Sequence, residues 1–358
     1  IGSNDYGYSS DTETITITIE GSTDNFSSSV VDLGGGTGSF ANVTSPLQFK
    51  LITPTSTTAY RYHRAKVVTS SGGCYFAQVQ FFEDNTGAAR GFTLGNGPSG
   101  YNDNTETFGA WQWLAGGGAG SSNEAGTINT TTTTVNTTAG ISIGTYTGTG
   151  SAATIGHGLG VVPKMVIVKE RANDVGGWFV YHEGMVATDP EDYYLLLNHY
   201  DPSAPVDDAT VWNDTAPTST VFSIGTHDDV NGSTDTFVYY AFADVEGFSL
   251  MGSYNGNSNA AGPLVYTGFK PSWILLRGVG RRDGFIYDSQ RSPYNEIDDG
   301  AFVNEAAAEN TTYKVDFLSN GFKIRSTGEF NTDGEITIFA AFAEYPFGGV
   351  DVTPSTTF

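Results

Sequence analysis

Residues 163–169 read Pro-Lys-Met-Val-Ile-Val-Lys, and 108 positions later residues 271–277 read Pro-Ser-Trp-Ile-Leu-Leu-Arg. The middle of each run is wholly apolar, which is typical of a central strand covered on both faces. We therefore expect Ile167 and Leu275 to be buried. A Gly-x-Tyr-x-Gly segment stands upstream of each run, at residues 144–148 and 252–256. The sequence thus contains the same strand-forming stretch twice.

The duplication continues downstream with its order kept and only small deletions. Three further pairs of landmarks are each separated by 100 positions: Phe222 and Phe322, Asn231 and Asn331, Phe242 and Phe342. A repeat of roughly 100 residues is too long for a solenoid unit and about one domain in size. Before each closing aromatic strand, Asn231-Gly232 and Asp333-Gly334 predict a hairpin with a type I′ turn.

The fold class predicted from these patterns is all-β, with serial β-sandwich (jelly-roll-like) domains and a tandem duplication. No segment carries a capped apolar stripe of period 3.6, and the 46 glycines favour short strands and turns. The predicted parts are a partial β-sandwich (1–90), a connecting segment rich in Gly and Thr (91–140), repeat 1 (141–250), repeat 2 (251–349) and a C-terminal tail (350–358).

The connecting segment, residues 91–140, has little complexity and no periodicity, so it is not expected to fold by itself. Trp111 and Trp113 stand alone in it and are the predicted contacts to a neighbouring domain or another subunit. Ordering a glycine-rich backbone costs much entropy, and copies that cover one another's irregular segments can offset this cost. We therefore predict a homo-oligomer, most simply a trimer.

Composition excludes several classes of protein. The net charge of −23, with 16 Lys and Arg against 39 Asp and Glu, has the wrong sign for nucleic-acid binding. A single cysteine, Cys74, rules out an intramolecular disulfide and is interpreted as a buried, inert thiol. No apolar run is long enough to insert into a membrane. Because the chain opens on Ile1 in strand-like sequence, we expect a processed product or a piece of a longer protein.

The sequence predicts no catalytic residues and no cofactor. The histidines have no metal-ligand spacing, and no G-x-S-x-G or P-loop motif is present. Loop acids are the alternative, since glycosidases use paired carboxylates; the second repeat lacks acids at matching places, so solvated loop positions are the interpretation. These acids are Glu183, Asp189, Glu191, Asp192, Asp207 and Asp208. Replacing Asp207 or Asp208 is expected to cost within ~0.5 kcal/mol.

A structural calcium ion is the second alternative, at residues 228–235. This stretch, Asp-Asp-Val-Asn-Gly-Ser-Thr-Asp, spaces its oxygen-bearing side chains as calcium loops do but lacks the bidentate Glu of an EF-hand. Its candidate ligands are Asp228, Asp229, Asn231 and Asp235. A plain hairpin turn remains the other interpretation of the same residues.

The first part of the chain resembles the C-terminal half of discoidin-type, galactose-binding-like β-sandwiches. The resemblance rests on the alternating Ile and Thr of residues 12–20, on Ala-Tyr-Arg-Tyr-His-Arg-Ala-Lys-Val-Val at 59–68, and on the aromatic stretch 74–83. It implies a sandwich whose front half is missing. Many members of that family bind sugars or lipids through end loops, but no site is carried over here.

The rest of the chain, about residues 105–349, resembles a repeated C-terminal domain of unknown function in the virion proteins of tailed, often marine, bacteriophages. The resemblance is carried by His-Gly-Leu-Gly at 157–160 followed by the 163–169 strand, by 212–222 and by Ala-Phe-Ala-Glu-Tyr-Pro-Phe at 341–347. It implies a non-enzymatic structural or adhesion protein of a tail fibre, spike or other appendage. Its expected partners are other virion proteins and a host-surface glycan or protein, and its expected location is the extracellular virion. A polysaccharide-degrading tailspike and a secreted bacterial surface protein remain the alternatives.

Overall fold

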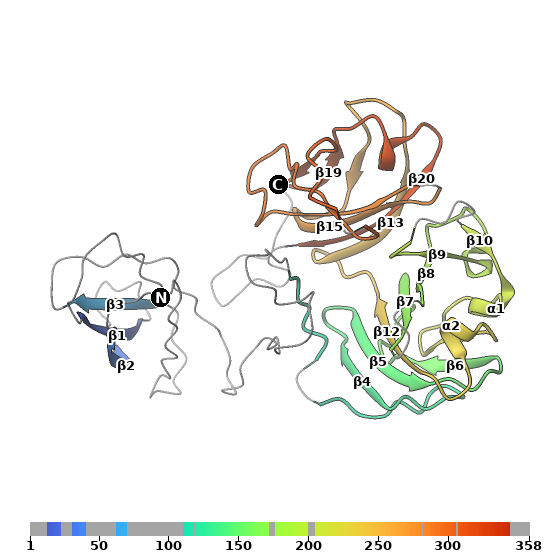
Figure 1. The fold of residues 1–358 in the computed structure, drawn as a ribbon, viewed down its shortest axis with the longest axis horizontal. Helices are drawn as coiled ribbons and strands as arrows, with labels where there is room; N and C mark the ends of the chain where they lie inside the picture. The colour runs from blue at the N-terminus through green and yellow to red at the C-terminus, as the bar shows by residue number, and fades with distance from the viewer. Residues whose placement is uncertain are drawn as a thin grey trace. The chain divides into compact units, whose positions relative to one another are not determined.

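The structure is a computed structural model that describes residues 13–22, 31–40, 62–69, 110–116, 119–171, 176–199, 205–280, 282–305 and 307–343. It forms two compact units, Ile1–Gln112 and Trp113–Phe358. Within the described residues, none of the helices has the length and apolar character required to cross a membrane. The protein is all-β, with antiparallel sheets and only short helical turns (Figure 1).

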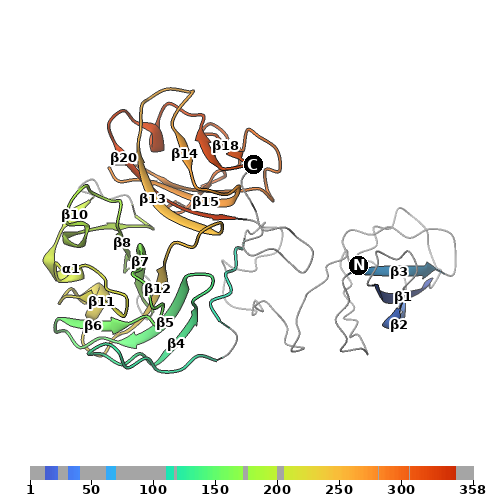
Figure 2. The ribbon, with the colours of Figure 1, turned by 180° about the vertical axis from the view of Figure 1, so that it is seen from behind.

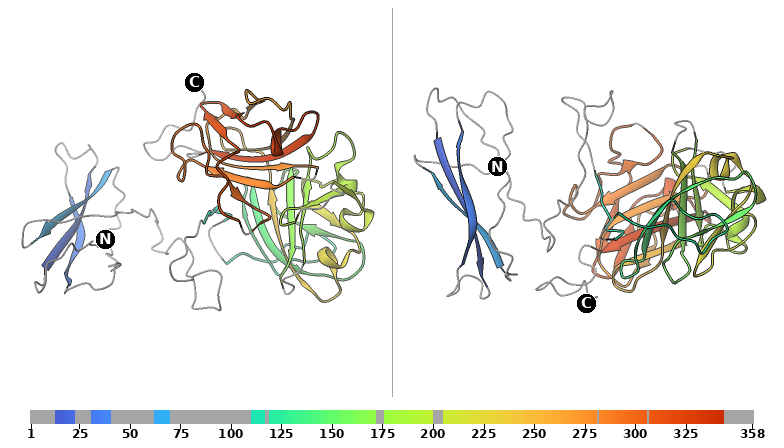
Figure 3. Two further views of the ribbon diagram at one scale, coloured as in Figure 1. Left: turned by 45° about the horizontal axis from the view of Figure 1, so that its top comes forward. Right: turned by 90° about the horizontal axis from the view of Figure 1, so that it is seen from below.

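The first unit contains a three-stranded antiparallel sheet in the order β2-β1-β3, drawn in blue in Figure 3. Its strands are β1 (Glu13–Ser22), β2 (Val31–Phe40) and β3 (Tyr62–Thr69). β1 holds the alternating Ile and Thr residues, so the period-two pattern was a valid strand signal. The strand expected at 74–83, together with Cys74, lies outside the described residues.

The second unit contains both repeats, and repeat 1 builds a seven-stranded sheet in the order β10-β9-β8-β7-β12-β5-β4 beside a two-stranded sheet, β11-β6. The strands are β4 (Thr132–Asn136), β5 (Ile141–Thr147), β6 (Ala153–Gly156), β7 (Met165–Glu170), β8 (Trp178–His182), β9 (Tyr193–Leu196), β10 (Val206–Asp207), β11 (Val221–Ile224) and β12 (Thr236–Phe242). The helical turns are η1 (Pro190–Asp192), α1 (Ala209–Trp212) and α2 (Asp228–Asn231).

Repeat 2 builds a five-stranded sheet in the order β13-β20-β15-β16-β17 and a three-stranded sheet, β14-β19-β18 (Figure 2). The strands are β13 (Ser249–Asn255), β14 (Leu264–Tyr266), β15 (Pro271–Gly278), β16 (Gly284–Asp288), β17 (Ala301–Phe302), β18 (Val315–Leu318), β19 (Gly321–Ile324) and β20 (Ile336–Ala343), with one helical turn, η2 (Glu329–Asn331).

The strand order is the same in the two repeats. The order β5-β12-β7-β8-β9 in repeat 1 corresponds to β13-β20-β15-β16-β17 in repeat 2, and the pair β6-β11 corresponds to β14-β19. The apolar strands β7 and β15 are central, each hydrogen-bonded to a strand on both sides. Ile167 and Leu275 lie in these strands with 7% and 4% of their surface exposed.

The two predicted hairpins are wrong. β11 and β12 belong to different sheets, as do β19 and β20, so neither pair is hydrogen-bonded as a hairpin. Asn231 is the last residue of α2. A type I′ turn requires a positive φ at both central residues, but the φ of Gly232 is −52°. An Asn-Gly dipeptide indicates only a local preference for a hairpin turn. Here it lies in the connection between β11 and β12, which belong to different sheets.

The two faces of the seven-stranded sheet pack against different partners. Val166, Val168 and Phe179 face the core of repeat 1, which contains Phe222 on β11. Their neighbours Met165, Ile167 and Val180 belong instead to an apolar cluster that includes residues of repeat 2. Because side chains alternate between the faces of a strand, the second face is the one that meets repeat 2. We call this contact the shared face.

Aromatic rings occupy the shared face. The equivalent residues Phe242 and Phe342 touch each other, with ring centroids 6.0 Å apart. Trp273, directly across the sheet from Phe342, lies on the same side. A contact between equivalent residues is what a self-complementary interface produces at its symmetry axis. The repeats are thus joined as one body rather than strung on a linker.

The segment 119–136, which we call the lead-in, lies along repeat 1 of its own chain. Ser121 and Thr133 exchange backbone hydrogen bonds of 3.1 and 2.7 Å, which fold the lead-in back on itself. Its last part is β4, paired with the edge strand β5. Ile128 bridges Ile155 on β6 and donates its N–H to Thr154 O at 3.1 Å. The lead-in therefore covers two strand edges at once.

One polar link across the shared face predicts a dependence of stability on pH. His182 is fully buried; its Nε2 bonds to Phe339 O at 3.2 Å, and its Nδ1 accepts from Gly184 N at 3.0 Å. Burial, partly opposed by that carbonyl and by Glu183, lowers the pKa of His182 to about 4. Between this pKa and the ordinary ~6.5, the unfolded chain binds a proton that the folded chain does not. The free energy of unfolding is therefore expected to be highest above ~pH 6.5 and to fall toward pH 4 by up to ~1.4 kcal/mol per pH unit.

Urea unfolding at a series of pH values tests this expectation. His182→Gln keeps a donor for Phe339 O and an acceptor for Gly184 N but does not titrate, so its stability curve should be flatter than that of the parent chain between pH 4 and 6.5. An equal slope in the parent and the variant would show that the acid sensitivity comes from other groups.

Candidate functional site

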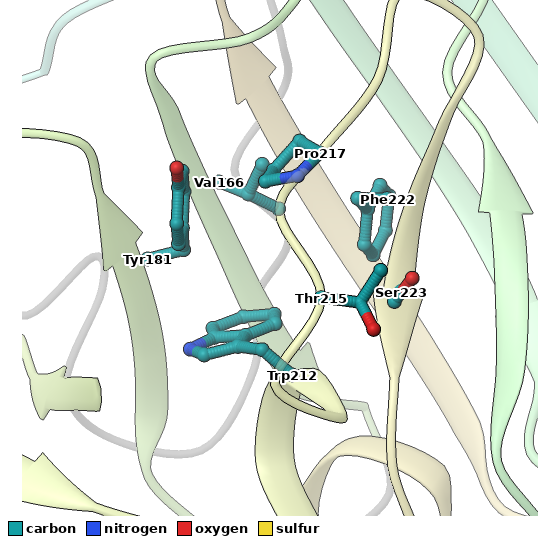
Figure 4. Close-up of a pocket in the computed structure, with 7 residues that line it drawn as sticks. All are labelled: Val166, Tyr181, Trp212, Thr215, Pro217, Phe222 and Ser223. Atoms are coloured by element: carbon teal, nitrogen blue, oxygen red, sulfur yellow. The ribbon is translucent and has the colours of Figure 1, made fainter. Parts of the chain in front are cut away.

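A small hollow in repeat 1 is the first candidate site (Figure 4). It is lined by Val166, Tyr181, Trp212, Thr215, Pro217, Phe222 and Ser223 and encloses about 180 Å³, part of which is open solvent. Figure 4 shows the rings of Tyr181, Trp212 and Phe222 around it. The space is too narrow for a water molecule. None of the seven lining residues carries a carboxylate, so the hollow offers aromatic contact and the three hydroxyl groups of Tyr181, Thr215 and Ser223 rather than acid–base chemistry.

Trp212 places a buried polar group, its indole N–H, at the wall of the hollow. Its side chain is 2% exposed, and its indole N–H has no hydrogen-bond partner. It lies at the end of α1, and its ring meets Tyr181 edge to face at 6.3 Å. Packing of the ring therefore holds this residue in place, at the cost of leaving one donor unpaired.

Several of the acids named in the sequence gather beside the hollow. Burial, followed by the charges of Glu191 and Glu183, raises the pKa of Tyr181. Desolvation raises the pKa of Asp192 too, with added repulsion from four neighbouring acids: Asp214, Asp189, Glu191 and Asp207. These residues form a negatively charged rim on η1, β10 and the turn after α1.

Asp208 differs from the rest of this rim because it caps a helix. Its Oδ1 accepts from Thr210 N at 2.8 Å and from Thr210 Oγ1 at 2.6 Å, at the start of α1. Although partial burial acts in the opposite direction, these bonds lower the pKa of Asp208. The expectation of a cost within ~0.5 kcal/mol rested on a solvated loop position, whereas the structure makes Asp208 an N-cap, which typically contributes ~1 kcal/mol.

We accordingly expect Asp208→Ala to lower the free energy of unfolding by ~1 kcal/mol. The adjacent exposed Asp207 is the matched control, and Asp207→Ala should change it by less than ~0.5 kcal/mol. Chemical denaturation of the two variants measures both values. Because the carboxylate is the capping form, the difference between them should shrink as the pH falls through the pKa of Asp208. Equal losses at neutral pH would contradict the capping role.

The calcium candidate Asn231 is part of a hydrogen-bonded node that both repeats contain. Asn231 is fully buried; its Nδ2 donates to Gly225 O and Ser151 O, both at 2.7 Å, and its Oδ1 accepts from Thr149 N at 2.8 Å. In repeat 2, Asn331 is likewise fully buried. Its Nδ2 donates to Ser326 O at 2.5 Å and Asn259 O at 2.9 Å, and its Oδ1 accepts from Asn257 N at 2.9 Å.

The same node explains the Gly-x-Tyr-x-Gly segments. Tyr146 Oη donates to Val230 O at 2.5 Å, and Tyr254 Oη donates to Phe330 O at 2.7 Å, so each hydroxyl binds the carbonyl just before the buried Asn. The last glycine approaches that Asn closely: a Cβ on Gly148 would lie 2.7 Å from the carbonyl carbon of Asn231. The motif therefore builds structure and supplies no reactive group.

The other calcium candidates do not form a ligand cluster with Asn231. Asp228 and Asp229 begin α2, and Asp235 directly precedes β12. Across the described ranges, no group of three or more His, Cys, Asp or Glu side chains is placed to hold a metal ion. The Asn231 side chain uses both of its polar atoms to fix backbone, and this role was not visible in the spacing of the acids.

Three of the histidines whose side chains the structure describes share one structural device. In each, Nδ1 accepts the backbone N–H two residues downstream: His157 accepts from Leu159 N at 3.2 Å, His182 from Gly184 N at 3.0 Å, and His227 from Asp229 N at 3.2 Å. Burial also lowers the pKa of His157. These side chains therefore cap turns.

The two candidate contact residues lie in different units. Trp113 is half-buried and packs edge to face on Trp273 at 5.0 Å and on Phe342 at 5.5 Å, so it sits on repeat 2 of its own chain. Trp111, also half-buried, belongs to the first unit. The contact that the sequence assigned to a neighbouring domain or subunit is, for Trp113, an intrachain contact at the shared face.

The fold and these sites define an all-β protein in which two tandem repeats share one face and most buried polar side chains hold backbone. Residues 79–346 match the model of a family described as a domain of unknown function, DUF7483. The match spans more than half of the chain, and the protein therefore belongs to this family. No curated protein and no solved structure matches the chain.

Proposed function

We propose that this chain is a non-enzymatic structural and adhesion protein of a bacteriophage virion, part of a tail fibre, spike or other appendage. The observation that carries the proposal is the shared face. Ring contacts between Phe242, Phe342, Trp113 and Trp273 lock two repeats into one body. A particle appendage needs such a body, because it has to hold its shape while it presents a surface.

The use of the polar interior supports the same proposal. The buried residues His182, Asn231 and Asn331 make hydrogen bonds to backbone groups and leave no free reactive atom facing a cleft. The surface is poor in charge, since only 15% of residues are charged, and the balance is strongly negative. Such a surface favours solubility outside a cell and disfavours nucleic acid as a partner.

The proposed partners are other virion proteins and a glycan or protein of the host surface, and the proposed location is the extracellular virion. A homo-oligomer, with a trimer as the simplest form, is part of the proposal. The lead-in does not support an oligomer, because its hydrogen bonds are made to repeat 1 of the same chain. Light scattering of the purified chain measures the oligomeric state.

A polysaccharide-degrading spike is the second candidate, and the acidic rim is the observation that favours it. Asp192 has a raised pKa among neighbouring carboxylates, which is the property that a general acid needs. Against it, the hollow beside the rim is too narrow for a sugar ring, and its lining has no carboxylate. A secreted bacterial surface protein is the third candidate.

Two measurements separate these candidates. Electron microscopy of phage particles labelled with an antibody to this chain is expected to show label on an appendage; label confined to the bacterial surface favours the secreted protein instead. The purified chain, incubated with host polysaccharide, is expected to release no reducing ends. Release that disappears in Asp192→Asn but persists in the exposed-site control Asp333→Asn would establish the spike enzyme and overturn the proposal.

A further inference from the structure

The repeats differ at the strand edges that the lead-in covers. In repeat 1, β4 pairs with the outer side of β5, and Ile128 bonds to the outer side of β6. Ile128 is 9% exposed and forms part of the repeat 1 core. In repeat 2, the corresponding strands are β13 and β14. No described segment pairs with β14 on the side away from β19.

The pairing registers identify the matching residues. Phe222 pairs with Ile155 in repeat 1, and its equivalent Phe322 pairs with Val265 in repeat 2. Val265 therefore corresponds to Ile155, and both are buried. One position earlier, Leu264 corresponds to Thr154, whose carbonyl accepts the N–H of Ile128.

At this edge, the backbone groups of β14 that do not bond to β19 point outward, and no described residue bonds to them. Pro263 O accepts from Ile324 N at 3.0 Å, and Thr267 N donates to Asn320 O at 3.0 Å. Both residues thus face β19 and its turn. Bonding direction alternates along an antiparallel strand, so the backbone groups of Leu264 and Tyr266 point away from β19, toward the side that the lead-in occupies in repeat 1.

The side chains at this edge are apolar and exposed. Leu264 is 59% exposed and Tyr266 is 67% exposed, whereas their equivalents in repeat 1, Thr154 and Gly156, lie beneath the lead-in. An edge strand with free backbone groups and apolar side chains is a template for another strand. Proteins that bind by strand addition use main-chain hydrogen bonds for affinity and side-chain contacts for specificity.

We propose that the open edge of β14 binds an extended, glycine- and threonine-rich segment of another polypeptide, as repeat 1 binds the lead-in. The occupant runs parallel to β14, as Ile128 does beside Ile155, and donates a backbone N–H to Leu264 O. It carries one aliphatic residue at the position of Ile128, flanked by small or hydroxyl side chains. The occupant comes from another polypeptide because the lead-in of this chain is already engaged by repeat 1.

A peptide with the sequence of residues 119–136 is the probe for this site. It carries a fluorophore at one end and a photoreactive leucine analogue in place of Ile128, and it is added to the full chain. Fluorescence polarisation is expected to show saturable binding, and irradiation should cross-link the peptide to residues 263–267. A scrambled peptide of the same composition should not bind.

Variants of the chain make the test specific. Leu264→Lys combined with Tyr266→Lys should weaken binding at least tenfold, because it places two charges at the edge without touching the core. Val161→Lys is the matched control, since Val161 is 52% exposed and lies in repeat 1, and its binding should equal that of the parent chain. Absence of saturable binding, equal binding by the double variant, or cross-links confined to residues 153–156 would each overturn the proposal. The inference is independent of the virion proposal, because peptide binding is measured without particle or glycan.

Discussion

Phe342→Ala is expected to lower the free energy of unfolding by about 3–5 kcal/mol. Phe342 is 5% exposed and touches four other aromatic rings: Trp113, Phe242, Phe248 and Trp273, with centroids 5.5, 6.0, 5.7 and 5.6 Å away. Truncation removes the transfer free energy of the ring and leaves a cavity that β15 and β20 are too constrained to close. It also deletes the edge-to-face contacts, which add ~0.5–1.5 kcal/mol for a pair.

Urea unfolding followed by tryptophan fluorescence measures this loss, and Trp113 and Trp273 report on the altered site directly. Tyr294→Ala is the control, because Tyr294 is 83% exposed and its removal should cost less than ~0.5 kcal/mol. A loss below ~1 kcal/mol for Phe342→Ala would mean that the shared face contributes little to stability. The view of the two repeats as one body would then be wrong.

The second large effect is expected at the buried asparagines. Asn231→Asp and Asn331→Asp keep the shape of the side chain but replace its N–H donors with an oxygen that faces two carbonyls. The lost hydrogen bonds and the buried charge should together cost about 3–5 kcal/mol at neutral pH. Because burial raises the pKa of a carboxyl, protonation at lower pH should recover part of the loss. The destabilisation should therefore grow as the pH rises.

The two variants check each other. Since both asparagines make the same three kinds of bond, their losses should agree within ~1 kcal/mol in denaturant titrations. Asn257→Asp is the control: its exposed side chain only accepts a hydrogen bond, from Asn259 N, and a carboxylate accepts equally well. A large loss in only one of the two buried variants would contradict the equivalence of the nodes.

The duplication and the central strands were predictable because they depend on patterns along the chain. Two copies of an apolar run at a fixed offset identify β7 and β15, and burial of Ile167 and Leu275 follows from the absence of a polar face. The sequence did not show that repeat 2 would pack against the second face of the repeat 1 sheet. Trp178 and Tyr240 are half-buried and pack against the apolar cluster that contains residues of both repeats. In the sequence they look like ordinary surface aromatics.

The local errors have a common cause. Asn231-Gly232 was interpreted as a hairpin turn and Asp208 as a solvated acid. Both interpretations considered only the residues adjacent in sequence. In the fold, Asn231 bonds to Ser151 and Thr149, about 80 positions away in sequence, and Asp208 caps a helix of only four residues. A four-residue helix has no periodic pattern by which a sequence reveals it. Likewise, β4 lies in a run of threonines. Threonine favours strands, but a run of threonines does not indicate which neighbouring strand β4 pairs with.

The shared face restricts how chains of this kind can gain or lose copies. Repeats that touch only through a linker can be added or deleted singly, as beads on a string. Here, deleting repeat 2 would expose Met165, Ile167 and Val180 to solvent, and a third repeat would find no free face of this kind to join. Genes that lengthen by this domain are therefore expected to do so two copies at a time, with the pair as the heritable unit.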